Sequence, residues 1–148
     1  MQVWIRNDCP DAGVDEDLLT ARAAKALAIL GFEKGELSVW LCDDASISEL
    51  HGRYLGSHTA TNVISFAQRE GEFSDLEPDV LGDVVISIDT AARDAREAGT
   101  SLMDEVSFLL VHGILHLAGY DHEGDQAHRS LEMEAKEVEL FRTIVNEA

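Results

Sequence analysis

The sequence predicts an α/β (or α+β) fold in which a small mixed sheet of three or four strands packs against helices. Two observations lead to this prediction: short β-rich runs are separated by helical runs, and the C-terminal half of the chain is mainly helical. The length of 148 residues suits one hydrophobic core. Because no linker or internal repeat interrupts the pattern, we expect a single domain over residues 1–148.

The predicted strands are short runs rich in apolar, β-branched and aromatic residues. The strongest is residues 81–88, which contains Val84, Val85, Ile86 and Ile88. The polar, acidic stretch 69–79 before it is typical of a surface loop. The four predicted strands cover residues 2–6, 37–41, 61–66 and 81–88.

The predicted helices are recognised by their apolar periodicity and by residues that favour helix ends. Gly31, Gly99 and Gly119 are the expected terminators of the first, third and fourth helices. The last helix should bury Leu131, Val138, Leu140, Phe141 and Val145. The expected helices run from Asp15, from a cap at Asp43 or Asp44, from a cap at Asp89 or Thr90, from Thr100 or Ser101, and from residue 126 to residue 146.

Composition limits the classes of function. The formal net charge is −18, from 29 acidic and 11 basic residues, so most of the surface repels nucleic acid. Contact with a polyanion is therefore expected to be confined and sensitive to salt. No apolar run is long enough to cross a bilayer, and no signal-peptide pattern opens the chain. With Cys9 and Cys42 far apart and expected to be reduced thiols, these features predict a cytoplasmic protein without a membrane partner.

Three of the six histidines lie within residues 112–122. His112 and His116 are four residues apart on a predicted helix, so both project from one face of it. Gly119 allows the chain to reverse at the helix end, which brings His122 back towards them. Three imidazoles around one ion are typical of a catalytic Zn²⁺ site, whose fourth position stays open for water. The sequence therefore predicts one zinc ion at the C-terminus of this helix.

The same histidine spacing occurs in metzincin zinc proteases, which carry H-E-x-x-H-x-x-G-x-x-H. In those enzymes the glutamate is the general base of peptide hydrolysis. Gly113 stands at that position here. The absence of the glutamate argues against a protease of that type, although the metal itself can still activate water.

Three stretches together resemble the YbeY family of bacterial rRNA maturation endoribonucleases. They are HGILHLAGYDH at 112–122, LGDVVIS at 81–87 and TNVISF at 61–66. The resemblance implies one α/β domain with zinc held by His112, His116 and His122. It also implies a cytoplasmic, single-strand-specific endoribonuclease that acts in 16S rRNA processing and ribosome quality control.

One segment departs from the family pattern. A functional arginine of the family falls on Leu55, which cannot make the bidentate phosphate contacts of a guanidinium. Arg53 is the candidate substitute. Because it lies two residues before Leu55 on a predicted helix, its side chain points from a different side of that helix. Asp121 is the other candidate catalytic residue besides His112, and we favour a role in orienting a ligand imidazole over that of a general base. Asp83 either forms a structural hydrogen bond or lines the cleft.

The sequence is also compatible with two functions other than that of a ribonuclease. A strongly acidic protein without the family arginine also suits a ribosome-assembly factor that binds the ribosomal subunit or basic ribosomal proteins, with little or no nuclease activity. Another zinc hydrolase, acting on a small ester or peptide, is the third hypothesis. The leading hypothesis has single-stranded RNA or rRNA as the substrate.

Overall fold

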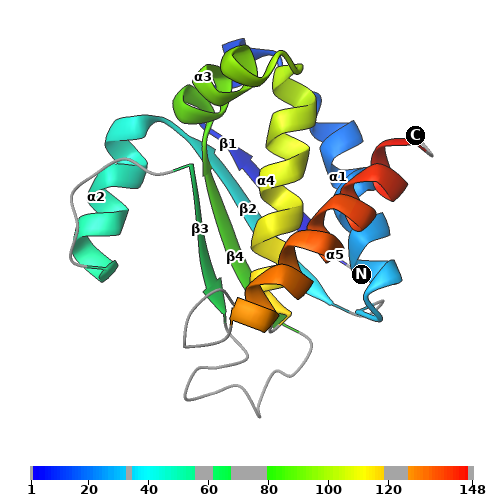
Figure 1. Ribbon diagram of the computed structural model, residues 1–148. Coiled ribbons are helices and arrows are strands. Elements are labelled where there is room, and N and C mark those ends of the chain that lie inside the picture. The colour runs from blue at the N-terminus through cyan, green and yellow to red at the C-terminus, as the bar shows by residue number, and fades with distance from the viewer. Residues whose placement is uncertain (1, 33–34, 56–61, 68–79, 119–126, 147–148) are drawn as a thin grey trace.

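The computed structural model describes residues 2–32, 35–55, 62–67, 80–118 and 127–146. Within these ranges four strands and five α-helices follow one another, together with a short 3-10 helix at Pro10–Ala12 (Figure 1). None of the described helices is long and apolar enough to cross a membrane. The elements are β1 (Gln2–Asn7), α1 (Glu16–Ile29), β2 (Glu36–Cys42), α2 (Asp44–Leu55), β3 (Val63–Ala67), β4 (Val80–Ser87), α3 (Ile88–Ala98), α4 (Leu102–Leu117) and α5 (Ala127–Asn146).

The four strands form one mixed sheet in the order β1-β2-β4-β3. The β1–β2 and β2–β4 pairs are parallel, while β3 runs antiparallel to β4. The predicted mixed sheet packed with helices is therefore confirmed, and all four predicted strands are present within two residues of their expected ends. Two parallel pairs require crossover connections, which the helices supply.

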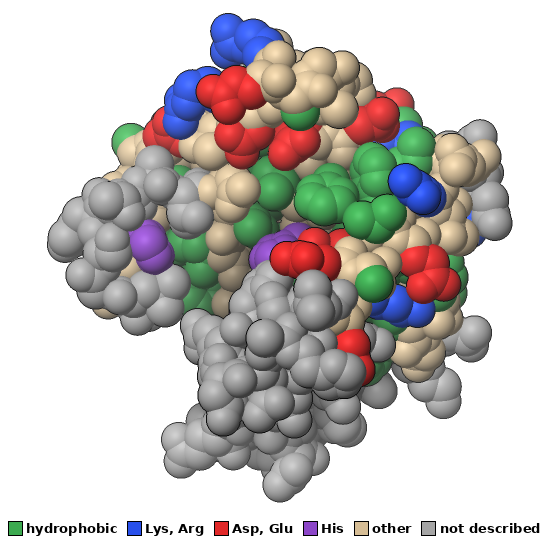
Figure 2. Space-filling view, in the orientation of Figure 1, with side chains coloured by type: hydrophobic (Ala, Val, Ile, Leu, Met, Phe, Trp, Pro, Cys, Tyr) green, Lys and Arg blue, Asp and Glu red, His purple; other side chains and the backbone are tan. Residues whose placement is uncertain are grey.

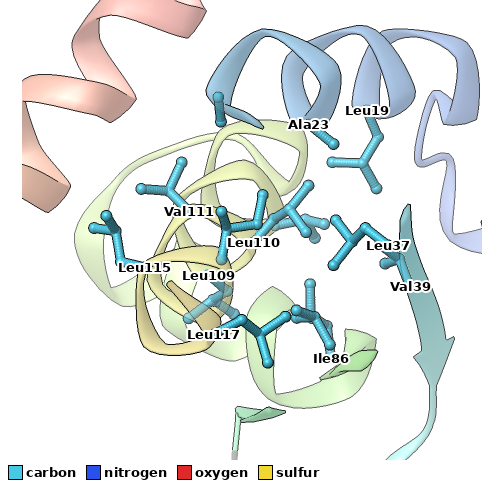
Figure 3. Close-up of a cluster of buried hydrophobic side chains, with 14 of the residues drawn as sticks. Leu19, Ala23, Leu37, Val39, Ile86, Leu109, Leu110, Val111, Leu115 and Leu117 are labelled. Atoms are coloured by element: carbon cyan, nitrogen blue, oxygen red, sulfur yellow. The ribbon is translucent and has the colours of Figure 1, made fainter. Parts of the chain in front are cut away.

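Helix α4 lies across one face of the sheet, with α1 and α5 packed beside it (Figure 1). The main hydrophobic core lies between this layer and the sheet. Figure 3 shows the α4 side chains Leu110 and Leu117 directed towards Leu37 and Ile86 of the sheet. Helix α2 packs from the other side, where Ile47 joins a smaller core with Cys42, Ile64 and Val85. Helix α4 is therefore held between the sheet on one side and helices α1 and α5 on the other.

Most of the observed helix ends agree with those predicted from the sequence, and one predicted N-cap, that of α3, is wrong. Asp15 caps α1 by accepting a hydrogen bond from the Leu18 amide at 3.0 Å, and Gly99 ends α3 in the left-handed region with φ of 72°. The cap of α3 is Ser87, not Asp89 or Thr90, because the Ser87 hydroxyl accepts the Thr90 amide hydrogen bond. The strand ends one residue earlier than predicted, so the helix begins directly at Ile88.

The apolar face of α5 also differs from the prediction. Its buried side chains are Met133, Glu137, Leu140 and Ile144, whereas Val138 is 41% exposed. The spacing of four, three and four residues keeps the buried set on one stripe of the helix. A carboxylate therefore occupies a position that the helix otherwise gives to apolar side chains.

Helix α4 approaches the sheet most closely at Gly113. A Cβ atom at this position would lie 2.6 and 2.9 Å from the two methyl carbons of Val84, and 3.2 Å from the Ser65 hydroxyl. The Ser65 hydroxyl also donates a hydrogen bond to the Gly113 carbonyl at 3.4 Å. Gly113 is thus required by contact between α4 and strands β3 and β4, and the position has no room for a glutamate.

We predict that Gly113→Ala destabilises the protein by about 1–3 kcal/mol, the usual cost of overpacking a filled core. The sign of this change in the free energy of unfolding is informative, because Gly→Ala in an open helix interior stabilises a protein by up to about 1 kcal/mol. Urea unfolding followed by circular dichroism measures the change. A Gly113→Ala variant as stable as wild type, or more so, would show that α4 is free to move away from the sheet.

Candidate metal centre

The candidate site is carried by the last two turns of α4. Ser101 caps the start of this helix by accepting a hydrogen bond from the Asp104 amide at 3.1 Å. Asp104 and Glu105 occupy the first turn, where carboxylates interact favourably with the helix dipole. A well-capped and largely buried helix gives its side chains fixed positions, which a metal site requires.

The structure brings His112 and His116 together as the sequence predicts. Their ring centroids are 6.4 Å apart and the two rings are tilted by 52°. Both side chains are half-buried, and the His112 side chain is 26% exposed. Figure 2 shows histidine side chains reaching the surface next to acidic side chains on this face of the molecule. Two imidazoles at this separation can bind one ion between them.

Glu137 of α5 also reaches the candidate site, and no local motif in the sequence marks it. Its Oε1 atom contacts Nδ1 of His112, across the α4–α5 interface. In the sequence Glu137 has the helical spacing of Met133 and Leu140, but only the structure shows that this stripe of α5 is the buried one. A histidine that binds zinc commonly donates its other ring N–H to a carboxylate. With Nδ1 turned to Glu137, Nε2 is the nitrogen of His112 that would meet a metal ion.

The third predicted ligand, His122, and the adjacent Asp121 lie outside the described residues. Among the residues that the structure describes, no group of three histidine, cysteine or acidic side chains is placed to hold a metal ion. The donors that are described do fit zinc, because two imidazoles share one helix face and one of them is oriented by a carboxylate. The complete ligand set remains a prediction from the sequence.

The cysteines do not offer a competing metal site. Both are free thiols in the described part of the chain, as expected, and Cys42 is fully buried. Burial, together with the charge of nearby Asp43, raises the pKa of Cys42 to about 12. Burial likewise raises the pKa of Cys9. Since the thiolate is the form that binds metal, neither side chain is prepared for it at neutral pH.

Arg53 lies on α2 and faces a different hollow from the histidine pair. It is exposed and lines a cavity of about 240 Å³ with Trp40, Ser46, Glu49 and Leu50. Trp40 and Leu50 also line a neighbouring cavity of about 590 Å³ on the sheet face opposite α4, where Asp83 lies. The side chain of Leu55 is outside the described part of α2. The described residues therefore do not place Arg53 beside His112 and His116.

The fold and its central helix define a small mixed α/β protein that presents two imidazoles on one helix face. A family model described as Endoribonuclease YbeY matches residues 6–145. An Endoribonuclease YbeY from Geobacter sulfurreducens is 51% identical over 146 residues, which cover 99% of this chain and 97% of the relative. One from Syntrophus aciditrophicus is 44% identical over 141 residues, covering 95% and 88%. The chain belongs to the YbeY family of endoribonucleases.

A solved structure has the same fold. The solution structure of TM1509 from Thermotoga maritima matches with a TM-score of 0.69 and covers 98% of this chain and 90% of that chain. The two sequences are 24% identical, so this likeness concerns the fold alone. The expected family and the expected fold class are both confirmed.

We predict that the purified protein binds one zinc ion per chain and that either His112→Ala or His116→Ala greatly weakens this binding. If the three predicted imidazoles are the ligands, removing one of them leaves too few donors for a stable zinc complex. Competition with a chromogenic chelator measures the affinity, and elemental analysis measures the stoichiometry. His51→Ala, on α2, is the matched control and should bind zinc as wild type does. Equal binding by all four proteins would contradict the assignment of the ligands.

Proposed function

We propose that this protein is a zinc-dependent endoribonuclease that cleaves single-stranded RNA in 16S rRNA maturation and ribosome quality control in the cytoplasm. The main support is the pair His112 and His116 on the central helix of a chain that belongs to an endoribonuclease family. His122 is the proposed third ligand. Asp121 is proposed to orient a ligand imidazole through a hydrogen bond.

The bound metal would supply the electrostatic part of the reaction, by acidifying a water molecule to a hydroxide nucleophile or by polarising a phosphoryl oxygen. The chain's own contribution is to hold the imidazoles in fixed positions at a half-exposed place, where an RNA chain can approach. Gly113 matters here because its position excludes the glutamate that serves as the base in zinc proteases. The close contact between α4 and the sheet thus favours the ribonuclease over a protease of that type.

The phosphate contact is the part of the family pattern that this chain alters. Leu55 takes the place of the arginine, and Arg53 faces the hollow beside Trp40 rather than the histidine pair. We propose that Arg53 binds the RNA chain at a distance from the bond that is cleaved. A guanidinium beside an aromatic ring can contact both a phosphate and a stacked base.

We predict that the zinc-loaded protein cleaves unstructured RNA and leaves a matched duplex intact, and that His116→Ala lowers the cleavage rate at least about 100-fold. The loss follows from removal of a metal ligand, since the metal carries the electrostatic stabilisation of the transition state. Gel electrophoresis of end-labelled RNA measures the rate, with His51→Ala as the control that keeps activity. Cleavage by His116→Ala at the wild-type rate would exclude the proposed mechanism, because it would come from another part of the protein or from a contaminant.

We predict that Arg53→Ala raises KM for single-stranded RNA about tenfold, with kcat unchanged, because Arg53 contacts RNA away from the reacting phosphate. The rise in KM should shrink at high salt, since ion pairs with phosphate are screened. Leu55→Arg is the complementary variant and should raise kcat by restoring a guanidinium at the family position. A fall in kcat without a change in KM for Arg53→Ala would instead place Arg53 at the reacting bond.

A second function is favoured by one observation, the net charge of −18. Such a charge suits a factor that binds basic ribosomal proteins on the assembling subunit. The two functions separate in one comparison of cleavage with binding to purified small ribosomal subunits. Binding retained by His112→Ala, together with no RNA cleavage by the zinc-loaded wild type, would favour the assembly factor over the ribonuclease.

A further inference from the structure

Glu137 is in an unusual environment for an acidic residue. Four polar or charged residues are buried among those that the structure describes, and Glu137, at 7% exposed, is the carboxylate among them. Its helix neighbours Glu134 and Glu139 are exposed. Burying a carboxylate is unfavourable unless a partner compensates for the lost hydration. A carboxylate at this buried position therefore indicates a specific polar contact, which an apolar side chain could not make.

The partner of Glu137 is one of the two imidazoles of the candidate metal centre. Its Oε1 atom contacts Nδ1 of His112, although the two residues lie 25 positions apart on different helices. A carboxylate at Nδ1 favours the tautomer that carries its hydrogen on Nδ1, so that Nε2 presents a lone pair. The same contact limits rotation of the ring about its bond to Cβ. Glu137 thus selects the nitrogen and the direction that His112 offers to an ion.

Apolar contacts also hold α5 against α4. Met133, Leu140 and Ile144 are buried on the same stripe, each at 2% exposure or less. Phe108 of α4 and Phe141 of α5 also meet edge to face, with their ring centroids 5.4 Å apart. These apolar contacts lie along the interface on both sides of Glu137. An apolar residue at position 137 would extend them, whereas a carboxylate adds a specific contact with the His112 ring.

We propose that Glu137 is a positioning residue of the metal centre, which fixes the tautomer and ring orientation of His112 and thereby raises the affinity for the metal. The inference rests on the proposed function only in taking His112 as a metal ligand. Loss of such a carboxylate typically weakens metal binding about 10–100-fold.

The test measures the zinc dissociation constant of the full chain by chelator competition. Glu137→Ala is expected to weaken binding about 10–100-fold. Glu137→Gln should weaken it less, because the amide oxygen still accepts from Nδ1. Two controls separate positioning from packing and from charge: Leu140→Ala removes a buried side chain from the same stripe, and Glu139→Gln removes an exposed charge from the same helix. Both controls should bind zinc as wild type does, even where Leu140→Ala lowers the melting temperature.

A second measurement uses the zinc-free protein, so its result does not depend on how much zinc is bound. Nitrogen-15 NMR of the imidazole rings should show His112 of the wild type with its hydrogen on Nδ1, and a mixture of tautomers in Glu137→Ala. If Glu137→Ala leaves both the tautomer and the zinc affinity unchanged while wild type binds zinc, the positioning role is wrong and the proposed function stands. If Leu140→Ala weakens zinc binding as much as Glu137→Ala does, the role is structural only. If wild type binds no zinc, the proposed metal centre fails and this inference fails with it.

Discussion

The close contact between α4 and the sheet at Gly113 positions both the hydrophobic core and the candidate metal centre. The helix backbone lies so close to β3 and β4 that a single added carbon would overlap the Val84 methyl groups. This contact sets the height of α4 over the sheet and turns His112 and His116, its neighbours on the helix, to the side that remains half-exposed. The same contact that orders the core therefore determines where the imidazoles reach solvent.

The helices on the far side of α4 complete this arrangement. Helix α5 covers α4 with apolar side chains and places one carboxylate, Glu137, against His112. The imidazole is thus held by its own helix on one side and by a second helix on the other. The His112 ring would therefore already be oriented before an ion arrives, which reduces the cost of binding. By contrast, the hollows lined by Arg53 and Asp83 lie on the other side of the sheet, around Trp40.

Much of the fold was predictable because local patterns and tertiary structure agree. The four strands, the stop at Gly99 and the cap at Asp15 follow from β-branched runs, a glycine and an aspartate at ordinary positions. The cap at Ser87 was missed because the strand and the following helix join without a turn, so no break in the pattern marks the boundary. The apolar face of α5 was wrongly predicted to include Val138. Hydrophobic patterning assigns buried positions to apolar residues, whereas here Glu137 is buried and Val138 is exposed.

The candidate site was predictable only where its residues are close in sequence. Spacing alone placed His112 and His116 on one helix face, whereas the contact with Glu137 joins two helices and depends on their packing. If these imidazoles hold the ion on which RNA cleavage depends, zinc returned stepwise to the metal-free protein should restore cleavage of single-stranded RNA. Cleavage should be absent at first, rise in proportion to bound zinc and level off at one ion per chain. Full activity in the metal-free protein would contradict this dependence on the ion.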